Sequence, residues 1–454
     1  MAPPASPEHR VELLGTVQVL HAHLTTSLCQ TGFQQTRTTE RERRWSLAAL
    51  ASFWTEVILR APPSLPQALE AAATGNGAGW PRGQATPEAF VARCQTLHWR
   101  CFATLYEAFV AQGRPQATPG SAAPLPTVRE PFPEVWSVDG SRWDAVAHRL
   151  KRLREVRARV RPGCVTAFYD LYRGLTRPLD CHPDAAAGER PRATAALTHV
   201  PQGPVLVGER LYGVGAFLAA LTSRGMAGLW RRNGCQRWRW LRALSKTGVA
   251  GGIAWATLIE VKGKQDSPTQ TLRWLRWRKG RERWELRTTV WVPEPLSVSD
   301  ALRLYPWRWK VARVFVDLKE VVHRHRFSPR SPNGVAMQGY AAALVPTAWR
   351  VAQGHSAQAR GIEPAESAPA KFFPRLAAAS IGLTWSALAF LEMQQANPGI
   401  ALSTPEWRLC DFAWTTLERI QVEPRNGRRR KRRFCQSRKQ WKSFPHIPGG
   451  KKLT

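Results

Sequence analysis

Two acidic residues stand where side chains could do chemistry together. Asp139 ends the apolar stretch EVWSVDG and Glu209 ends PVLVGE, and a predicted helix follows each of them. Short runs rich in β-branched and aromatic residues are typical of strands. A strand, an acid and a helix therefore occur twice, which predicts an α/β layer. Open sheets of this class usually place their sites at strand ends, so both acids are candidate site residues.

Arg and Trp alternate through residues 230–292, in RWRWLRAL, TLRWLRWRKG and RWELRTTVWV. The period of two predicts antiparallel β structure. Aromatic rings interleaved with arginines suit stacking on nucleic-acid bases and contact with phosphates. The alternative is a small sheet whose Trp face packs inward and whose Arg face is solvated. Both interpretations can hold, for opposite faces of one sheet.

The whole chain is strongly basic. It has 454 residues, and 66 Lys and Arg against 33 Asp and Glu give a formal net charge of +33. A charge of this size is typical of proteins that bind a polyanion. The hydrophobic fraction of 43% and the 21 Trp exclude a disordered basic arm. The sequence therefore predicts a folded protein that faces nucleic acid.

The cysteines and the apolar segments exclude other classes. None of the eight Cys belongs to a CxxC pair or to a Cys/His pattern with zinc spacing, which predicts reduced thiols in a cytosolic chain. The N-terminus lacks the charged and apolar regions of an export signal. The longest uncharged apolar run, 376–391, is shorter than the ~18 residues of a spanning helix. We expect a cytoplasmic protein with no membrane partner.

A third group of residues lies in PLSVSDALRLYPWRWKVARVFVDLKEVV, which is predicted to begin a long amphipathic helix. Ser297 or Ser299 is its expected N-cap. The spacing of three residues in this segment, Tyr305, Arg308 and Lys319, matches the spacing in a known family. With the two strand-end acids and the Arg/Trp-rich stretch before it, this segment resembles the bacterial insertion-sequence transposases of the DDE type. Their final core helix carries Tyr, Arg, Glu and Lys at these spacings.

The resemblance covers residues 134–327 and implies the fold and the cofactor. The fold is an α/β ribonuclease H-like catalytic core with a β-rich insertion, flanked by N-terminal and C-terminal helical regions. Asp139 and Glu209 are implied to be catalytic and to ligate Mg²⁺ or Mn²⁺ in a two-metal site. Two such cations activate a water or 3′-hydroxyl and stabilise the leaving oxygen. Glu209 stands where the family usually has Asp, and the longer side chain shifts the carboxylate.

Ala312 occupies the position of the family's catalytic Glu and cannot ligate a metal. Neither acid that follows replaces it, because Asp317 lies about 140° around the helix and Glu320 about 12 Å along it. The sequence therefore predicts a weakened metal site. This is expected of a decayed or repurposed transposase, or of a chain mutated to trap a DNA complex.

The resemblance also implies DNA contacts near the cut by Tyr305, Arg308 and Lys319, and we expect Arg210 to join them. For Arg308 and Lys319 the alternative is a solvated cationic helix face, and for Tyr305 it is a packed ring. A final cationic block is typical of segments that bind phosphate backbones without sequence preference. Its residues are Arg428, Arg429, Arg430, Lys431, Arg432 and Arg433.

These features divide the chain into seven segments. They are a helical DNA-binding region (1–111), a linker (112–133), the first part of the ribonuclease H-like core (134–229) with a linker-like stretch at 182–203, the Trp/Arg-rich β insertion (230–296), the core helix with the signature motif (297–327), a C-terminal helical region for dimerisation (328–424) and a basic tail (425–454). For the first segment, a helix-turn-helix-like arrangement and an ordinary helical bundle both fit.

Three functions are open on these grounds. The first is a cut-and-paste DNA transposase, which binds double-stranded DNA at the terminal inverted repeats and at the target as a homodimer in a synaptic complex, in the bacterial cytoplasm at the nucleoid. The second is a catalytically silent DNA-binding protein derived from a transposase. The third is a structure-selective RNA-binding protein that uses the Trp-rich sheet.

Overall fold

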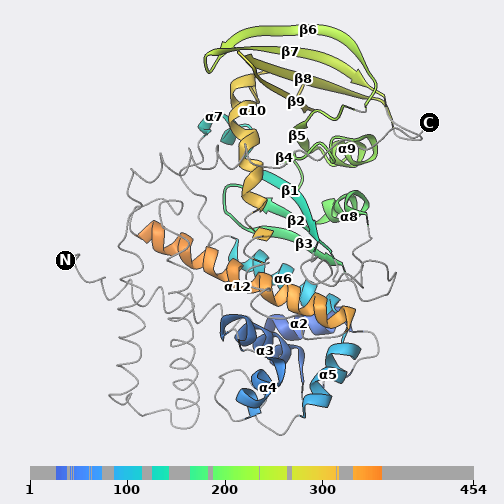
Figure 1. Ribbon diagram of the computed structural model, residues 1–454, viewed down its shortest axis with the longest axis vertical. Helices are drawn as coiled ribbons and strands as arrows, with labels where there is room; N and C mark the ends of the chain where they lie inside the picture. The colour runs from blue at the N-terminus through green and yellow to red at the C-terminus, as the bar shows by residue number, and fades with distance from the viewer. Residues whose placement is uncertain are drawn as a thin grey trace, which may run out of the picture.

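The structure is a computed structural model that shows helices at one end, a mixed sheet in the middle and an antiparallel extension of that sheet at the other end (Figure 1). It describes residues 27–37, 41, 43, 45–60, 62, 64–73, 86–114, 125–142, 164–182, 188–234, 236–262, 268–312, 314, 315, 318 and 331–359. The chain therefore has the mixed α/β class that its strand and helix patterns predict.

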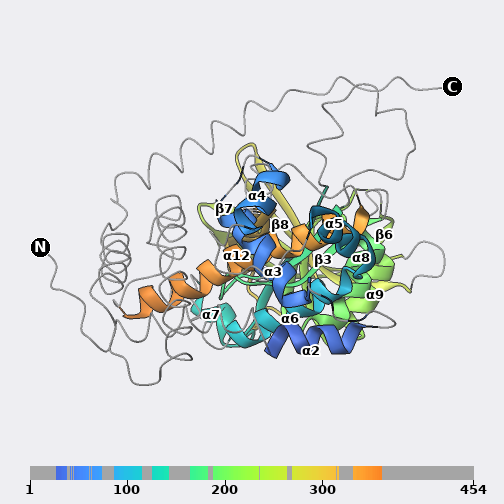
Figure 2. The ribbon, with the colours of Figure 1, turned by 90° about the horizontal axis from the view of Figure 1, so that it is seen from below.

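The helical end is built on an aromatic core. Phe53 lies edge-on to Trp45, Trp54 and Phe90, with ring centroids 5.7, 5.3 and 4.7 Å away. The helices around this core are α2 (Ser27–Thr36), α3 (Leu47–Arg60), α4 (Leu65–Ala73), α5 (Pro87–Thr96), α6 (Arg100–Gly113) and α12 (Pro332–Ala359). Helix α12 packs on α3, α5 and α6 (Figure 2). Segments from both ends of the described chain therefore share one core.

The described strands form one nine-stranded sheet of order β3-β2-β1-β4-β5-β9-β8-β7-β6. They are β1 (Val135–Arg142), β2 (Cys164–Asp170), β3 (Thr176–His182), β4 (Val205–Gly208), β5 (Ala227–Arg231), β6 (Trp238–Val249), β7 (Gly252–Val261), β8 (Gln270–Lys279) and β9 (Glu282–Thr288). The pairs β1–β4 and β4–β5 are parallel, and β2 is antiparallel to β1 and β3. Among β1 to β5, only β2 is therefore reversed.

The two faces of the central strands pack on different layers. Trp136 belongs to the core formed with α8 (Glu189–Ala196) and α9 (Gly215–Thr222). Val135 and Val207 belong to the core shared with α10 (Val298–Leu304) and the helical end. Because side chains alternate along a strand, Asp139 and Glu209 are on the same face as Val135 and Val207. The alternation of side chains along β1 and β4 therefore places both acids on the face of the sheet that packs on α10.

The Arg/Trp-rich region is antiparallel, as its period of two predicts, and it continues the central sheet. Strand β9 pairs with β5 from Leu229 opposite Thr288, and β8, β7 and β6 follow outward. Ala250 and Gly251, with φ of 50° and 74°, make the tight turn between β6 and β7. Positive φ at two successive residues matches the twist of a hairpin. The insertion is thus an extension of the central sheet.

The arginines of this extension do not all lie on a solvated face, which corrects one of the two interpretations. Arg273 and Arg287 are fully buried. Arg273 Nη2 donates to the carbonyl of Leu296, and Arg287 Nη1 donates to Gln236 Oε1 at 2.6 Å. The loops next to the sheet cover these two side chains and supply acceptors. A period of two predicts alternation, but it does not predict which face a loop covers.

Two segments predicted as linkers contain helices. Helix α8 and the 3₁₀ turn η2 (Leu197–His199) lie within 182–203, and α7 (Pro126–Arg129) lies within 112–133, which α6 also enters. These helices are short, so their few buried residues give no helical period. Helix α12 lies in the segment 328–424, which is predicted to be helical. The helix predicted after Asp139 falls in 143–163, outside the described residues.

No helix in the described part of the chain has both the length and the apolar character to cross a bilayer.

Candidate functional site

Asp139 and Glu209 are brought together by the parallel pairing of β1 and β4. Ser137 is opposite Val207 in this register, so each acid lies two residues beyond a paired position. Glu209 directly follows β4, whereas Asp139 lies inside β1, opposite Ala167 of β2. The sequence predicts strand-end acids in both cases, and the structure places both at the point where β1 and β4 stop pairing.

Arg308 lies between the two carboxylates. Its Nη1 is 3.5 Å from Asp139 Oδ2, and its Nη2 is 3.0 Å from Glu209 Oε1. The Arg308 side chain is only 3% exposed, compared with 19% for Asp139 and 45% for Glu209. Its backbone is also fixed, because the Ser137 hydroxyl donates to the Arg308 carbonyl at 3.3 Å. The site is therefore a buried guanidinium facing two carboxylates.

A change of helix type positions Arg308. Helix α10 begins at its N-cap Ser297, whose Oγ accepts a hydrogen bond from the Asp300 backbone at 3.0 Å. The expected single helix instead becomes the 3₁₀ turn η3 (Tyr305–Trp309) at Tyr305. Pro306 has no backbone N–H for an α-helical bond, and short 3₁₀ turns are common where α-helices are interrupted. Helical residues resume through Ala312.

The resemblance also makes Tyr305, Ala312 and Lys319 of this segment important. Tyr305 is buried and meets Trp284 edge-on at 6.1 Å, and burial raises the pKa of its hydroxyl while the charge of Arg308 opposes this. Ala312 is half-buried in the helical residues after η3. Lys319 lies outside the described residues, as do Asp317 and Glu320.

The charges of the site influence one another. The pKa of Asp139 is raised to about 6, because burial and the charge of Glu209, which raise it, together outweigh the charge of Arg308, which lowers it. Desolvation thus outweighs the ion pair, because a carboxylate out of water is costly to ionise. The pKa of the Tyr212 hydroxyl is also well above its usual value, through burial and then through Glu189, Asp139 and Glu209. A third carboxylate, Glu189, is therefore within electrostatic range of the site.

Glu189 and Tyr212 are site residues that the sequence analysis did not single out. Tyr212 donates its hydroxyl hydrogen to Glu189 Oε1. The Glu189 side chain lies over Gly140, where a Cβ would be 2.4 Å from Glu189 Cδ. The motif GERLYG and the glycine after Asp139 are signals that could have indicated Tyr212 and Gly140. Glu189 gave no signal, because it begins a short helix in a linker-like stretch.

The site does not present a three-ligand metal centre. Within the described ranges, no three His, Cys, Asp or Glu side chains form a group that could hold a metal ion. Asp139 and Glu209 face Arg308, Glu189 accepts from Tyr212, and Ala312 has no ligating atom. These residues, as arranged, fit an internal cation and do not fit two divalent cations.

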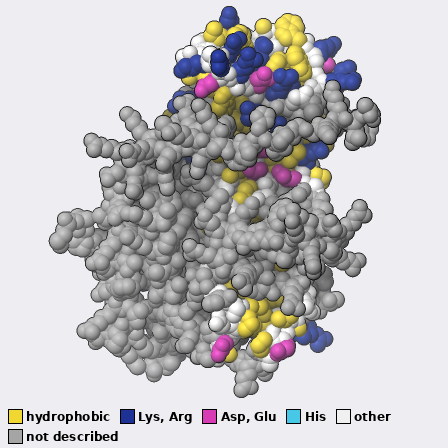
Figure 3. Space-filling model, viewed as in Figure 1, with side chains coloured by type: hydrophobic (Ala, Val, Ile, Leu, Met, Phe, Trp, Pro, Cys, Tyr) yellow, Lys and Arg dark blue, Asp and Glu magenta, His cyan; other side chains and the backbone are white. Residues whose placement is uncertain are grey.

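The β6 edge of the sheet carries an exposed aromatic and cationic surface. Trp240 is 59% exposed, and Arg239, Arg242 and Lys246 on the same strand are also exposed. Lys and Arg side chains crowd this end of the molecule together with hydrophobic ones (Figure 3). We call Arg239, Trp240, Arg242 and Lys246 the β6 surface.

Other Trp and Arg side chains of the insertion stack on each other. The guanidinium carbons of Arg276 and Arg232 lie 4.5 and 5.2 Å from the centroid of the Trp274 ring. Arg232 also pairs with Glu285 at 2.7 Å. The Arg/Trp pattern of the sequence thus includes structural cation–π contacts as well as an exposed surface.

The remaining predicted DNA-contact residues are distributed differently. Arg210 follows Glu209 directly and is exposed. The cationic block Arg428, Arg429, Arg430, Lys431, Arg432 and Arg433 lies outside the described residues.

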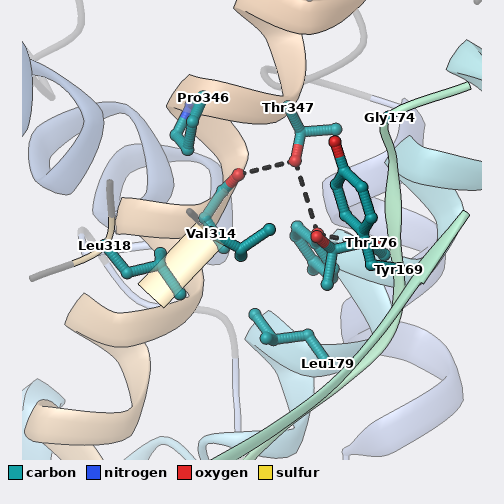
Figure 4. A pocket seen from close by; sticks show the side chains of 10 residues that line it. Tyr169, Gly174, Thr176, Leu179, Val314, Leu318, Pro346 and Thr347 are labelled. Carbon is teal, nitrogen blue, oxygen red and sulfur yellow. Dashed lines mark hydrogen bonds between the residues drawn. The ribbon is translucent and has the colours of Figure 1, made fainter. Parts of the chain in front are cut away.

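A small cavity between β3, α6 and α12 is structural (Figure 4). Tyr106 donates its hydroxyl hydrogen to the Thr176 carbonyl at 2.8 Å and lies 3.3 Å from Thr347 Oγ1. Thr347 in turn donates to the Ala343 carbonyl at 2.7 Å. The cavity has a volume of about 20 Å³, enough for roughly one water. The hydroxyls of Tyr106 and Thr347 thus connect α6, β3 and α12 across this cavity.

No protein-family model matches the chain, and a search of the curated proteins finds no match.

Proposed function

We propose that this chain is a transposase-type protein of an insertion sequence, which binds element ends and target DNA as a homodimer in a synaptic complex. One observation carries the proposal. Asp139 and Glu209, from parallel neighbouring strands, meet at Arg308 of the segment that resembles the family's signature. Three positions selected by a sequence resemblance are thereby neighbours in space, although they are far apart along the chain.

A ribonuclease H-like core is part of this proposal. The order β3-β2-β1-β4-β5, in which only β2 is reversed, supports it. The antiparallel strands β6 to β9 stand between β5 and α10 in the sequence, where the resemblance expects an insertion.

Duplex DNA is the proposed partner because of the charge and the exposed surface. Residues 236–290 contain 13 Lys and Arg against 4 Asp and Glu, and the β6 surface exposes part of this charge around Trp240. Arginines bind phosphates through charge, and an exposed indole stacks on bases or sugars. The N-terminal helices are proposed to recognise the element ends, and residues 328–424 to dimerise.

Cleavage is the impaired part of the proposed activity. The resemblance assigns Mg²⁺ or Mn²⁺ to Asp139 and Glu209, but these carboxylates pair with Arg308, and Ala312 offers no third ligand. We therefore assign no chemical step to a metal ion. A catalytically silent DNA-binding protein is the second candidate, and the pairing of both acids with Arg308 favours it.

The experiment that tests the proposal compares three nucleic acids by fluorescence anisotropy. They are duplexes with the termini of the DNA segment that encodes the chain, a scrambled duplex, and a duplex RNA of the same sequence. We expect tight binding of both DNAs, with preference for the termini, and weaker binding of the RNA. Equal or tighter binding of the RNA would overturn the proposal. Nicking of the termini in Mn²⁺ then separates the transposase from the silent protein.

A further inference from the structure

We infer that Arg308 is a built-in counter-ion, which occupies the place between Asp139 and Glu209 that the resemblance gives to a divalent cation. The free protein therefore pairs both carboxylates with its own guanidinium and takes up no Mg²⁺ or Mn²⁺ there. The inference rests on the proposed function only for the expectation of a metal. The ion pairs themselves come from the described residues.

The burial of Arg308 supports a fixed position. A guanidinium that is 3% exposed cannot exchange its partners for water, and arginine does not lose its proton in proteins. A buried charge of this kind must be paired. Asp139 and Glu209 are the carboxylates paired with Arg308 in the described part of the chain. Their pairing with Arg308 is therefore obligatory while the site stays closed.

Two contacts of Arg308 with groups other than the carboxylates, and the packing of Tyr305, hold Arg308 in this orientation. The Ser137 hydroxyl donates to its backbone carbonyl at 3.3 Å. The guanidinium carbon lies 4.2 Å from the centroid of the Trp309 ring. Tyr305, one turn earlier, is locked edge-on against Trp284. The side chain is thus anchored by backbone, ring stacking and the buried start of η3.

The space between the carboxylates suits a guanidinium better than a metal ion. Its planar fork reaches Asp139 Oδ2 and Glu209 Oε1 with different nitrogens, at 3.5 and 3.0 Å. Mg²⁺ requires oxygen ligands at about 2.0–2.1 Å in octahedral geometry. A cation at that distance from both oxygens would lie against the two Arg308 nitrogens, and like charges repel. Metal binding therefore requires Arg308 to leave.

The third carboxylate does not change this conclusion. Glu189 lies over Gly140 and accepts the hydrogen of the buried Tyr212 hydroxyl. It is therefore committed to a hydrogen bond and does not compensate for Ala312.

Titration of Mn²⁺ tests the inference on the full chain without DNA, with free Mn²⁺ followed by electron paramagnetic resonance. Arg308→Met keeps the length of the side chain and removes its charge. We expect no saturable site in the wild type that depends on Asp139, and apparent affinity at least ~10-fold higher in Arg308→Met. Adding Asp139→Asn to Arg308→Met should remove the gain. Arg93→Met, which changes another buried arginine whose Nε donates to the Trp45 carbonyl, should show no gain.

Two results would overturn the inference. One is saturable Mn²⁺ binding by the wild type that Asp139→Asn abolishes. The other is a folded Arg308→Met variant whose Mn²⁺ affinity equals that of the wild type.

If Arg308→Met does not fold, the melting temperature of the wild type decides. This melting temperature should be the same with and without about 1 mM Mn²⁺, because only a bound ligand stabilises the native state. An increase that Asp139→Asn removes would overturn the inference.

The outcome of these Mn²⁺ measurements does not depend on whether the protein has the proposed function. A metal-free Arg308 site in a protein that ignores DNA would remove the transposase proposal and leave the counter-ion intact. Wild-type Mn²⁺ binding in a protein that prefers element ends would do the reverse.

Discussion

The guanidinium of Arg308 lies 3.0 Å from the carboxylate of Glu209, and the arginine is far more buried than its partner. This contact joins the loop after β4 to the turn η3. A buried cation next to a half-exposed anion is held in place by its need for a counter-charge. Arg308 is therefore expected to stabilise the fold as well as to set the charge of the site.

Replacing Arg308 by Met should lower the free energy of unfolding by about 2–4 kcal/mol. It leaves two neighbouring carboxylates without their cation, and the loss is limited because Glu209 is 45% exposed. Urea denaturation measures it. The matched control is Arg239→Met, whose pair with Glu260 at 3.2 Å is on the surface, so its loss should be below about 1 kcal/mol. Equal losses in the two variants would contradict the structural role of Arg308.

Gly140→Ala tests the packing of Glu189. The added Cβ would lie 2.4 Å from Glu189 Cδ, so the Glu189 side chain must move and release the Tyr212 hydroxyl. We expect a loss of about 1–2 kcal/mol in the free energy of unfolding, because Tyr212 would keep a buried hydroxyl without its acceptor. Gly234→Ala, with open space around the new Cβ, should be neutral.

A double variant completes this test. Glu189→Ala removes the obstacle, so Gly140→Ala should cost less in that background than in the wild type. If Gly140→Ala has the same cost with and without Glu189, the proposed contact does not determine the packing there.

The position of the acids was predictable from the sequence, but the partner of Arg308 was not. Asp139 and Glu209 end apolar runs, and parallel pairing of such runs aligns their ends. The spacing of Tyr305 and Arg308 indicated a functional segment. It could not show that Pro306 converts the helix to a 3₁₀ turn, which turns Arg308 toward the carboxylates. The expected phosphate contact of Arg308 stays a prediction.

The limits of the fold prediction have similar causes. The period of two indicated the antiparallel strands of the insertion, because this signal is local. The burial of Arg273 and Arg287 depends on the loops that cover them, which are distant in sequence or irregular. Helix α8 is eight residues long and rich in small residues, so its pattern resembled a linker. Glu189 was missed with it.

The β6 surface should contribute directly to DNA affinity. Trp240→Ala should weaken the binding of a single-stranded oligonucleotide with the element-end sequence by about 1–3 kcal/mol, because an exposed indole stacks on unpaired bases. Ile253→Ala, which removes an exposed apolar side chain from the neighbouring strand β7, is the matched control. Anisotropy titrations of both variants decide this prediction, and an equal effect of the two would remove Trp240 from the interface.

Binding should also depend steeply on salt. We expect a log–log slope of magnitude above about 5, because each neutralised phosphate contributes roughly 0.9. Deleting residues 425–454, which contain no acidic residue, should flatten the slope and leave the preference for element ends intact. A slope that the deletion does not change would mean that the tail makes no phosphate contacts.

Nicking of element-end DNA by the Ala312→Glu variant is the most direct test of the transposase proposal. The new carboxylate would stand four residues after Arg308 and would add a third negative charge to the site, which the single charge of Arg308 cannot balance and which favours divalent cations in its place. It would also restore the missing ligand. We predict that Ala312→Glu nicks the end duplex in Mn²⁺ at least ~10–100-fold faster than the wild type, and that adding Asp139→Asn abolishes the gain. A folded Ala312→Glu variant that binds the ends but cuts them no faster than the wild type would contradict the proposal and favour the silent DNA-binding protein.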